Sequence, residues 1–164
     1  MGAITRRTLA TLLLSAAVVT AGAVPAQSAS AQPAPAIGVL TGVRTGVHPT
    51  FDRIVLDFAG PPPQVTHRFV DELIQDGSGD IEWLTGAAFV EVVATPAYSH
   101  DDQGNPSWPG PRKFRTRNLA NVMAVSVPGD YEAVLLIGVG MRRQTWARVF
   151  TLTAPSRVVI DVGR

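Results

Sequence analysis

The sequence predicts an antiparallel all-β domain, arranged as a sandwich or a barrel. Short runs rich in β-branched residues recur at a spacing of roughly 10–12 residues, and Gly, Pro, Asn and Asp separate them. The helical spacing of apolar residues is almost absent. In chain order, the predicted strands are residues 37–44, 53–58, 65–70, 81–84, 87–95, 121–127, 131–139, 145–153 and 157–162.

Three turn-forming sequences lie between predicted strands: AGPPP at 59–63, DGSGD at 76–80 and VPGD at 127–130. Residues 69–74 contain apolar pairs at i, i+4 spacing. This spacing suits a single helical turn as well as the end of a strand, and both interpretations stay open.

The N-terminal residues 1–31 predict an export signal peptide. They combine a short basic start, with Arg6 and Arg7, an apolar stretch and small residues typical of a cleavage site. The apolar stretch is shorter than the roughly 20 residues of a membrane span, which favours cleavage over a retained anchor. The two arginines fit a twin-arginine signal and an ordinary secretory signal equally. Residues 32–36 form a Pro/Ala linker, and residues 37–164 form one domain expected outside the cytoplasm.

Composition excludes several classes of function. The 164 residues include no cysteine, which rules out disulfides, thiolate metal ligands, a cysteine nucleophile and a lipid-modified cysteine. The formal charge of +1 becomes −1 when residues 1–31 are removed, because they carry two arginines and no acidic residue. Without a dense basic stripe, nucleic-acid binding is not expected. No cofactor and no membrane attachment after signal cleavage are expected either.

One strand pattern occurs twice, as RIVLDF at 53–58 and RVVIDV at 157–162. Period-2 alternation places the large apolar residues of each copy on one face and Arg, Val and Asp on the other. If the two strands pair antiparallel with Val55 opposite Val159, the arginine of each copy faces the aspartate of the other. Cross-strand charge pairs of this kind fix register, and they also allow a symmetry-related binding feature. The residues of this repeated motif are Arg53, Asp57, Arg157 and Asp161.

Four stretches carry a resemblance to a known family: His48–Phe58, Gly129–Ala133, Ile137–Gly140 and Pro155–Val162. In this order they resemble the AMIN-like domain of secreted actinobacterial proteins, over about residues 36–164. The resemblance implies an all-β fold, an antiparallel β-sandwich with pseudo-symmetric halves. It also implies a relation to AMIN domains, which bring cell-wall amidases and some secretion proteins to the envelope by binding peptidoglycan. No cysteine is present for a lipid anchor, and nothing outside the β domain is long enough to be an amidase.

The sequence offers little for catalysis or metal binding. The three histidines, His48, His67 and His100, fall in separate segments without the spacing of zinc ligands. His100-Asp101-Asp102 fits no calcium loop, and Gly77-Ser78-Gly79 lacks the nucleophile elbow and is typical of a hairpin turn. No metal site and no enzymatic activity are therefore predicted.

Two segments are candidates for ligand binding. Residues 98–113 form the longest segment without strand character, in which Trp108 beside Tyr98 and Arg112 can stack on a sugar ring or anchor a partner protein. Trp108 can equally fold back over one end of the domain. The pair Arg142 and Arg143, in an apparent hairpin connection, can meet the carboxylates of stem peptides, although such arginines are often simply solvated.

The predicted function is that of a secreted, non-catalytic domain that binds the cell envelope. Its expected partner is a cell-wall glycan or stem peptide, with peptidoglycan as the first candidate. The alternative is a protein-interaction module that docks onto an envelope protein through a sheet edge or through the 98–113 loop.

Overall fold

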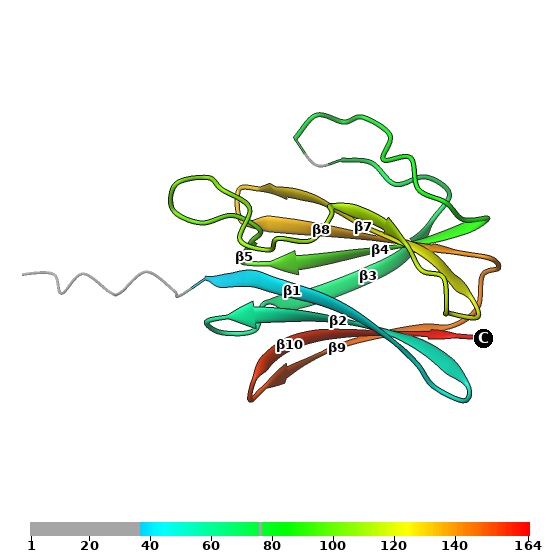
Figure 1. The fold of residues 1–164 in the computed structure, drawn as a ribbon. Coiled ribbons are helices and arrows are strands. Elements are labelled where there is room, and N and C mark those ends of the chain that lie inside the picture. The colour runs from blue at the N-terminus through cyan, green and yellow to red at the C-terminus, as the bar shows by residue number, and fades with distance from the viewer. Residues whose placement is uncertain (1–36, 76) are drawn as a thin grey trace, which may run out of the picture. The chain divides into compact units, whose positions relative to one another are not determined.

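A computed structural model describes residues 37–75 and 77–164. In these residues ten β-strands form two five-stranded sheets that pack face to face, and there is no helix (Figure 1). The predicted all-β sandwich is thus confirmed, and the helical turn considered at residues 69–74 does not form. The expected export signal and linker, residues 1–36, lie outside the described residues.

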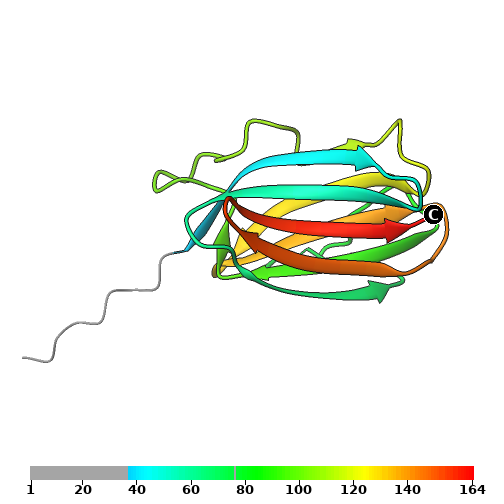
Figure 2. The same cartoon turned by 90° about the horizontal axis from the view of Figure 1, so that it is seen from below.

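The first sheet has the strand order β5-β1-β2-β10-β9. All its pairs are antiparallel except β1 with β5, which run parallel over two residue pairs. Figure 2 looks onto the outer face of this sheet, with β1, β2, β10 and β9 side by side and no described segment in front of them. Its strands are β1 (Gly38–Val47), β2 (Phe51–Ala59), β5 (Ala97–Tyr98), β9 (Ala147–Thr153) and β10 (Ser156–Gly163).

The second sheet has the order β3-β4-β8-β7-β6, with every pair antiparallel. The chain crosses between the sheets several times, and one crossing, residues 142–146, joins β8 to β9. Arg142 and Arg143 therefore lie in a connection between sheets, and their expected hairpin is wrong. The strands of this sheet are β3 (Gln64–Val70), β4 (Ala88–Thr95), β6 (Lys113–Arg115), β7 (Val122–Tyr131) and β8 (Val134–Met141).

The core lies between the two sheets and is built from alternate residues of their strands. Ile54 and Leu56 of β2 and Ile160 of β10 point inward and are fully buried, as the alternation predicted. They meet residues of the second sheet such as Val92 and Ile137. Each aliphatic side chain removed from water in this way stabilises the fold by roughly 1.5–3 kcal/mol.

The repeated motif pairs in the predicted register. Strands β2 and β10 are antiparallel neighbours, with Val55 opposite Val159, Arg53 opposite Asp161 and Arg157 opposite Asp57. Arg53 donates two hydrogen bonds to the Asp161 carboxylate, from Nε at 2.6 Å and from Nη2 at 2.8 Å.

The second expected charge pair takes a different partner. Asp57 accepts two hydrogen bonds of 2.7 Å from Arg44 of β1, while Arg157 donates to the carbonyl of Pro155. The reason is the neighbour of Asp57 on β1, which is Gly42. Because Gly42 has no side chain, the long side chain of Arg44 reaches across to the carboxylate.

Two predicted elements differ from the structure, and two short strands were not predicted. Residues 81–84 form no strand, and only Ile81 makes an isolated bridge, with Ile74. The short strands β5 and β6 carry no local pattern and were not predicted. The expected turn at 127–130 is an irregular stretch inside β7, where Gly129 has a φ of 138°.

The turn between β7 and β8 instead consists of Glu132 and Ala133, with φ values of 50° and 61°. A tight hairpin with two left-handed residues usually contains Asn or Gly at these positions. A Glu-Ala turn therefore gives no sequence signal, which explains why the turn was placed too early.

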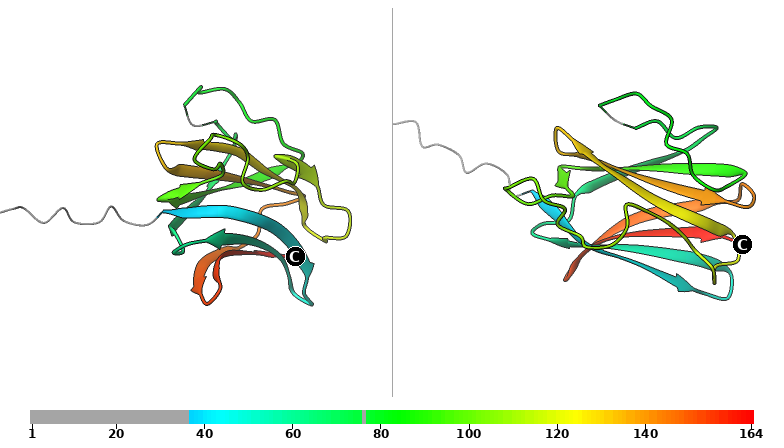
Figure 3. Two further views of the ribbon diagram at one scale, coloured as in Figure 1. Left: turned by 60° about the vertical axis from the view of Figure 1, so that its left-hand side comes forward. Right: turned by 45° about the horizontal axis from the view of Figure 1, so that its top comes forward.

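Residues 71–75 and 77–87, here called the strap, lie against the outer face of the second sheet (Figure 3, right). Leu73 is buried, and its Cδ1 atom lies 2.7 Å from where a Cβ on Gly138 of β8 would be. Glu82 of the strap is also buried and forms polar contacts with Ser126 and Lys113 of this sheet, each at 2.8 Å. The strap thus lies over one outer face of the sandwich, whereas no described residue outside the first sheet covers that sheet's outer face.

Candidate functional site

The open face of the first sheet carries a row of aromatic and arginine side chains. Alternation along β2 and β9 points every second residue away from the core. The outward-pointing side chains of β9 include that of Trp146, the residue just before the strand. The carbonyl of Trp146 accepts a hydrogen bond from the amide of Gly163 of β10. We call this surface the aromatic face, and it consists of His48, Phe51, Arg53, Trp146, Arg148 and Phe150.

The rings at one end of the aromatic face are in contact. His48 stacks on Phe51 with ring centroids 4.4 Å apart and an interplanar angle of 14°. The centroids of Phe51 and Trp146 are 6.2 Å apart. Trp146 is 51% exposed, so much of its indole is accessible from solvent.

Gly163 sets the position of Trp146. A Cβ added to Gly163 would lie 2.5 Å from the indole Nε1, so the ring occupies the space that any other side chain at 163 would need. The indole therefore lies against the backbone of β10. Such a ring offers a flat apolar surface to a ligand.

Two guanidinium groups complete the aromatic face. The Cζ atom of Arg53 lies 5.1 Å from the centroid of Phe51 and 5.9 Å from that of Phe150, and Arg148 lies 4.9 Å from Phe150. Asp161, which is buried beneath them, holds Arg53 by its paired hydrogen bonds, and these raise the pKa of Arg53. The guanidinium is thus fixed in place and its charge is compensated.

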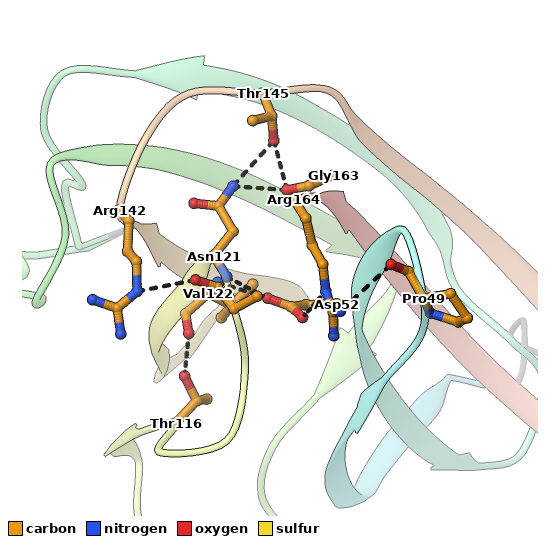
Figure 4. Close-up of polar contacts among 10 residues, drawn as sticks. Pro49, Asp52, Thr116, Asn121, Val122, Arg142, Thr145, Gly163 and Arg164 are labelled. Carbon is orange, nitrogen blue, oxygen red and sulfur yellow. Dashed lines mark hydrogen bonds and ion pairs between the residues drawn. The ribbon is translucent and has the colours of Figure 1, made fainter.

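At the end of the sandwich next to Trp146, a buried carboxylate organises the backbone (Figure 4). Asp52 accepts hydrogen bonds from the amides of Asn121 at 2.6 Å and Val122 at 3.0 Å, and from Nε of Arg164 at 3.3 Å. Burial alone raises the pKa of the Asp52 carboxyl, but these hydrogen bonds, with one from the amide of Ala120, outweigh it and hold that pKa below its ordinary value. Asp52 is therefore ionised at neutral pH.

Three arginines surround a hollow at this end of the sandwich. The hollow has a volume of about 200 Å³ and is lined by Ala120, Asn121, Arg142, Arg143 and Arg164. We call it the arginine hollow. It brings the predicted pair Arg142 and Arg143 together with Arg164, which the sequence did not single out.

The other predicted ligand-binding residues lie elsewhere in the fold. Tyr98 belongs to β5, where its ring contacts His100, and Arg112 donates to the carbonyl of Pro128 at 2.7 Å. Trp108 is half-buried, packs against the core and meets the ring of Phe114 edge-on at 6.2 Å. Trp108 and Arg112 help to line a small hollow, but they do not join the aromatic face.

Comparison with known proteins places this fold in a family. Residues 38–164 match the AMIN-like domain. The chain belongs to the AMIN-like domain family. No curated protein and no solved structure shows significant similarity to it. AMIN-like domains are in general non-catalytic binding modules related to the cell wall, and they are typically extracytoplasmic.

The AMIN-like domain contains one cluster with residues common in catalysis. Ser99 and His100 both contact Asp130, the Ser99 hydroxyl donating at 2.6 Å and His100 Nδ1 lying 3.2 Å away. Because Ser99 donates to the carboxylate rather than to the histidine, this geometry does not activate the hydroxyl as a nucleophile. Asp101 points into its own loop, where it accepts hydrogen bonds from the amides of Gln103 and Asn105.

Within the described residues, no group of three His, Cys, Asp or Glu side chains is placed to hold a metal ion. In the same part of the chain, no helix has the length and apolar character that a membrane crossing needs.

Sequence reasoning missed most of the aromatic face, although one signal for it was present. Trp146, Arg148 and Phe150 alternate along a predicted strand, which places all three on one side of it. The opposite side carries the smaller Ala147, Val149 and Thr151, and a surface with exposed aromatic side chains can bind a ligand. Phe51 and Gly163 gave no such signal, because their contact with Trp146 depends on the order of strands in the sheet.

Proposed function

We propose that this AMIN-like domain is a secreted, non-catalytic module that binds the glycan of a cell-wall polymer, peptidoglycan in the first place, through the aromatic face. The observation that carries the proposal is the half-exposed indole of Trp146, which lies against Gly163 of β10 and beside the stacked rings of Phe51 and His48. Aromatic faces attract the apolar C–H faces of sugar rings, while nearby polar groups bind the hydroxyls.

The length of the aromatic face suits an extended polymer. Trp146 and Phe150 are four residues apart on one strand, which corresponds to about 13 Å at a rise of roughly 3.3 Å per residue. Arg53 and Arg148 lie between the rings and present N–H donors along the same line. Because Asp161 holds Arg53 in place, a ligand pays little ordering entropy to use it.

Co-sedimentation of the protein with purified sacculi tests this function. We expect the wild-type protein to pellet with sacculi, and Trp146→Ala to lower the bound fraction several-fold. Trp83→Ala is the matched control, because Trp83 is 77% exposed but belongs to the strap on the other sheet. Wild-type protein that stays wholly in the supernatant at low salt would refute the function, and equal binding by the two variants would refute the assignment to the aromatic face.

A second function, docking onto an envelope protein, is favoured by one edge of the first sheet. Strand β1 continues to Val47, but its pairing with β5 ends at Val39. An edge of this kind can accept a strand from a partner. Recovery of one stoichiometric envelope protein that remains bound after digestion of the wall would favour this function over glycan binding.

A further inference from the structure

We propose that the arginine hollow binds an oxyanion, a carboxylate or a phosphate, that is attached to the same wall polymer whose sugar rings lie on the aromatic face. This inference rests on the proposed function and adds a second, charged subsite to it.

The arginine hollow carries positive charge that the described residues do not neutralise. Of the three guanidinium groups, only that of Arg164 pairs with a carboxylate, Asp52 at 3.3 Å. Among the ion pairs of the described residues, none involves Arg142 or Arg143. The guanidinium groups of Arg142 and Arg143 thus have no carboxylate partner among the described residues, at a hollow that is open to solvent.

The backbone beneath these arginines is held in place by Asn121. Its Oδ1 accepts the amide of Arg143 at 3.2 Å, and its Nδ2 donates to the carbonyl of the same residue at 3.2 Å. Arg142 is fixed separately, because its amide donates to the carbonyl of Asn121 and its Nε donates to the carbonyl of Ala120 at 3.0 Å. In Figure 4 the terminal nitrogens of Arg142 point away from this network.

The hydrogen bonds that anchor Arg142 and Arg143 do not use their terminal guanidinium nitrogens, which are the donors that bind oxyanions. Terminal guanidinium nitrogens form paired hydrogen bonds with carboxylates and phosphates. Since the anchoring bonds hold the backbone of both arginines and the Nε of Arg142, less entropy is lost when an anion binds. A volume of about 200 Å³ is several times the roughly 30 Å³ share of a water molecule, so an oxyanion fits together with some of its hydration.

Gly163 connects the arginine hollow to the aromatic face. Its outer side carries the indole of Trp146, and its carbonyl accepts hydrogen bonds from Asn121 Nδ2 at 2.7 Å and from Thr145 Oγ1 at 2.9 Å. The next residue, Arg164, lines the hollow. A sugar ring on Trp146 with an acidic substituent directed toward this end of β10 would therefore reach both subsites.

The test compares soluble probes by calorimetry with the full chain. The probes are a neutral chitin oligosaccharide, a muropeptide with free carboxylates, the same muropeptide fully amidated, and a glycerol-phosphate oligomer. We expect the wild-type protein to bind the acidic muropeptide at least about tenfold more tightly than the amidated one, with a preference that weakens as salt is added. This comparison needs no variant.

The variant Arg142→Gln/Arg143→Gln should lose this preference and keep wild-type affinity for the neutral oligosaccharide. The control Arg115→Gln/Arg117→Gln removes the same charge from exposed residues outside the hollow and should change neither affinity. Far-UV circular dichroism confirms that both double variants fold. If the glycerol-phosphate oligomer, rather than the acidic muropeptide, loses affinity in Arg142→Gln/Arg143→Gln, the oxyanion site stands and phosphate is its ligand.

Two outcomes separate this inference from the proposed function. Binding of the neutral oligosaccharide that depends on Trp146, together with equal affinity for acidic and amidated muropeptides and no effect of Arg142→Gln/Arg143→Gln on any probe, would overturn the oxyanion site alone. Failure of wild-type protein to bind any of the four probes would overturn both.

Discussion

Two aspartates of strand β2 provide a direct test of what burial does to a carboxylate in this fold. Asp52 is fully buried and accepts the amides of Asn121 and Val122. Asp57 lies on the outer face, where its side chain is 29% exposed and pairs with Arg44, which is 62% exposed. Replacing each with alanine removes the same group from the same strand.

The expected costs differ several-fold. Asp52→Ala leaves two buried amides without an acceptor, each at roughly 1–3 kcal/mol, and deprives Arg164 of its counter-ion. The total loss of unfolding free energy should be about 3–5 kcal/mol, as for other broken buried pairs. Asp57→Ala breaks an exposed pair, which contributes about 0–1 kcal/mol.

Urea unfolding followed by tryptophan fluorescence measures the difference. With a slope of about 2 kcal/mol per molar urea, Asp52→Ala should lower the midpoint by about 1.5–2.5 M, and Asp57→Ala by less than about 0.5 M. Equal shifts in the two variants would refute the argument that the Asp52 network holds the end of the sandwich together.

Two further measurements address stability. Hydrogen bonds outweigh burial and hold the pKa values of Asp52 and Glu82 below their ordinary values of 3.8 and 4.5, so the folded state binds fewer protons than the unfolded state in that range. The stability that these two carboxylates contribute should therefore be fully present above about pH 5 and fall as the pH drops below the ordinary values, and equal urea midpoints at neutral pH and near pH 3 would contradict this. Gly140→Ala would drive a Cβ into the carbonyl oxygen of Thr85 in the strap and should cost about 1–3 kcal/mol. Gly46→Ala, with nothing within 4 Å of its Cβ, should change stability by less than about 0.5 kcal/mol, and similar thermal midpoints for both variants would show that the strap is not packed closely on β8.

The two outer faces of this AMIN-like domain differ because of the glycines beneath them. On the second sheet, Gly138 and Gly140 of β8 leave room for the strap, whose Leu73 and Thr85 lie close to them. On the first sheet, Gly163 leaves room for one indole. Among the described residues, the chain therefore covers one outer face with its own segment and leaves the other uncovered.

The pairing of β2 with β10 shows what a sequence pattern can predict. Alternation alone placed Ile54 and Ile160 in the core, and opposite charges in the two copies selected the register that puts Arg53 opposite Asp161. Both signals are local or pairwise, since they need only the period of a strand and the sign of two charges. The partner of Asp57 was not predictable in this way, because Arg44 belongs to a third strand.

The candidate site shows which contacts such sequence patterns cannot predict. Arg142 and Arg143 were singled out as basic residues, but their position beside Arg164 follows from the crossing between sheets that joins β8 to β9. Trp108 is of a residue type that often contacts ligands, yet it packs against the core. In both cases the deciding contacts come from segments that are distant in the sequence.

By itself, the sequence determined the all-β class, most strands and the resemblance to the AMIN-like family, because strand alternation is a property of short segments. It also determined the register of the repeated motif on the condition that its two copies pair as antiparallel neighbours. Only the tertiary structure decided that Phe51, Trp146 and Gly163 form one surface and that three arginines share one hollow. The physical reason is that strand order and the crossings between sheets depend on the packing of the whole core. They therefore cannot be predicted from the sequence of any single segment.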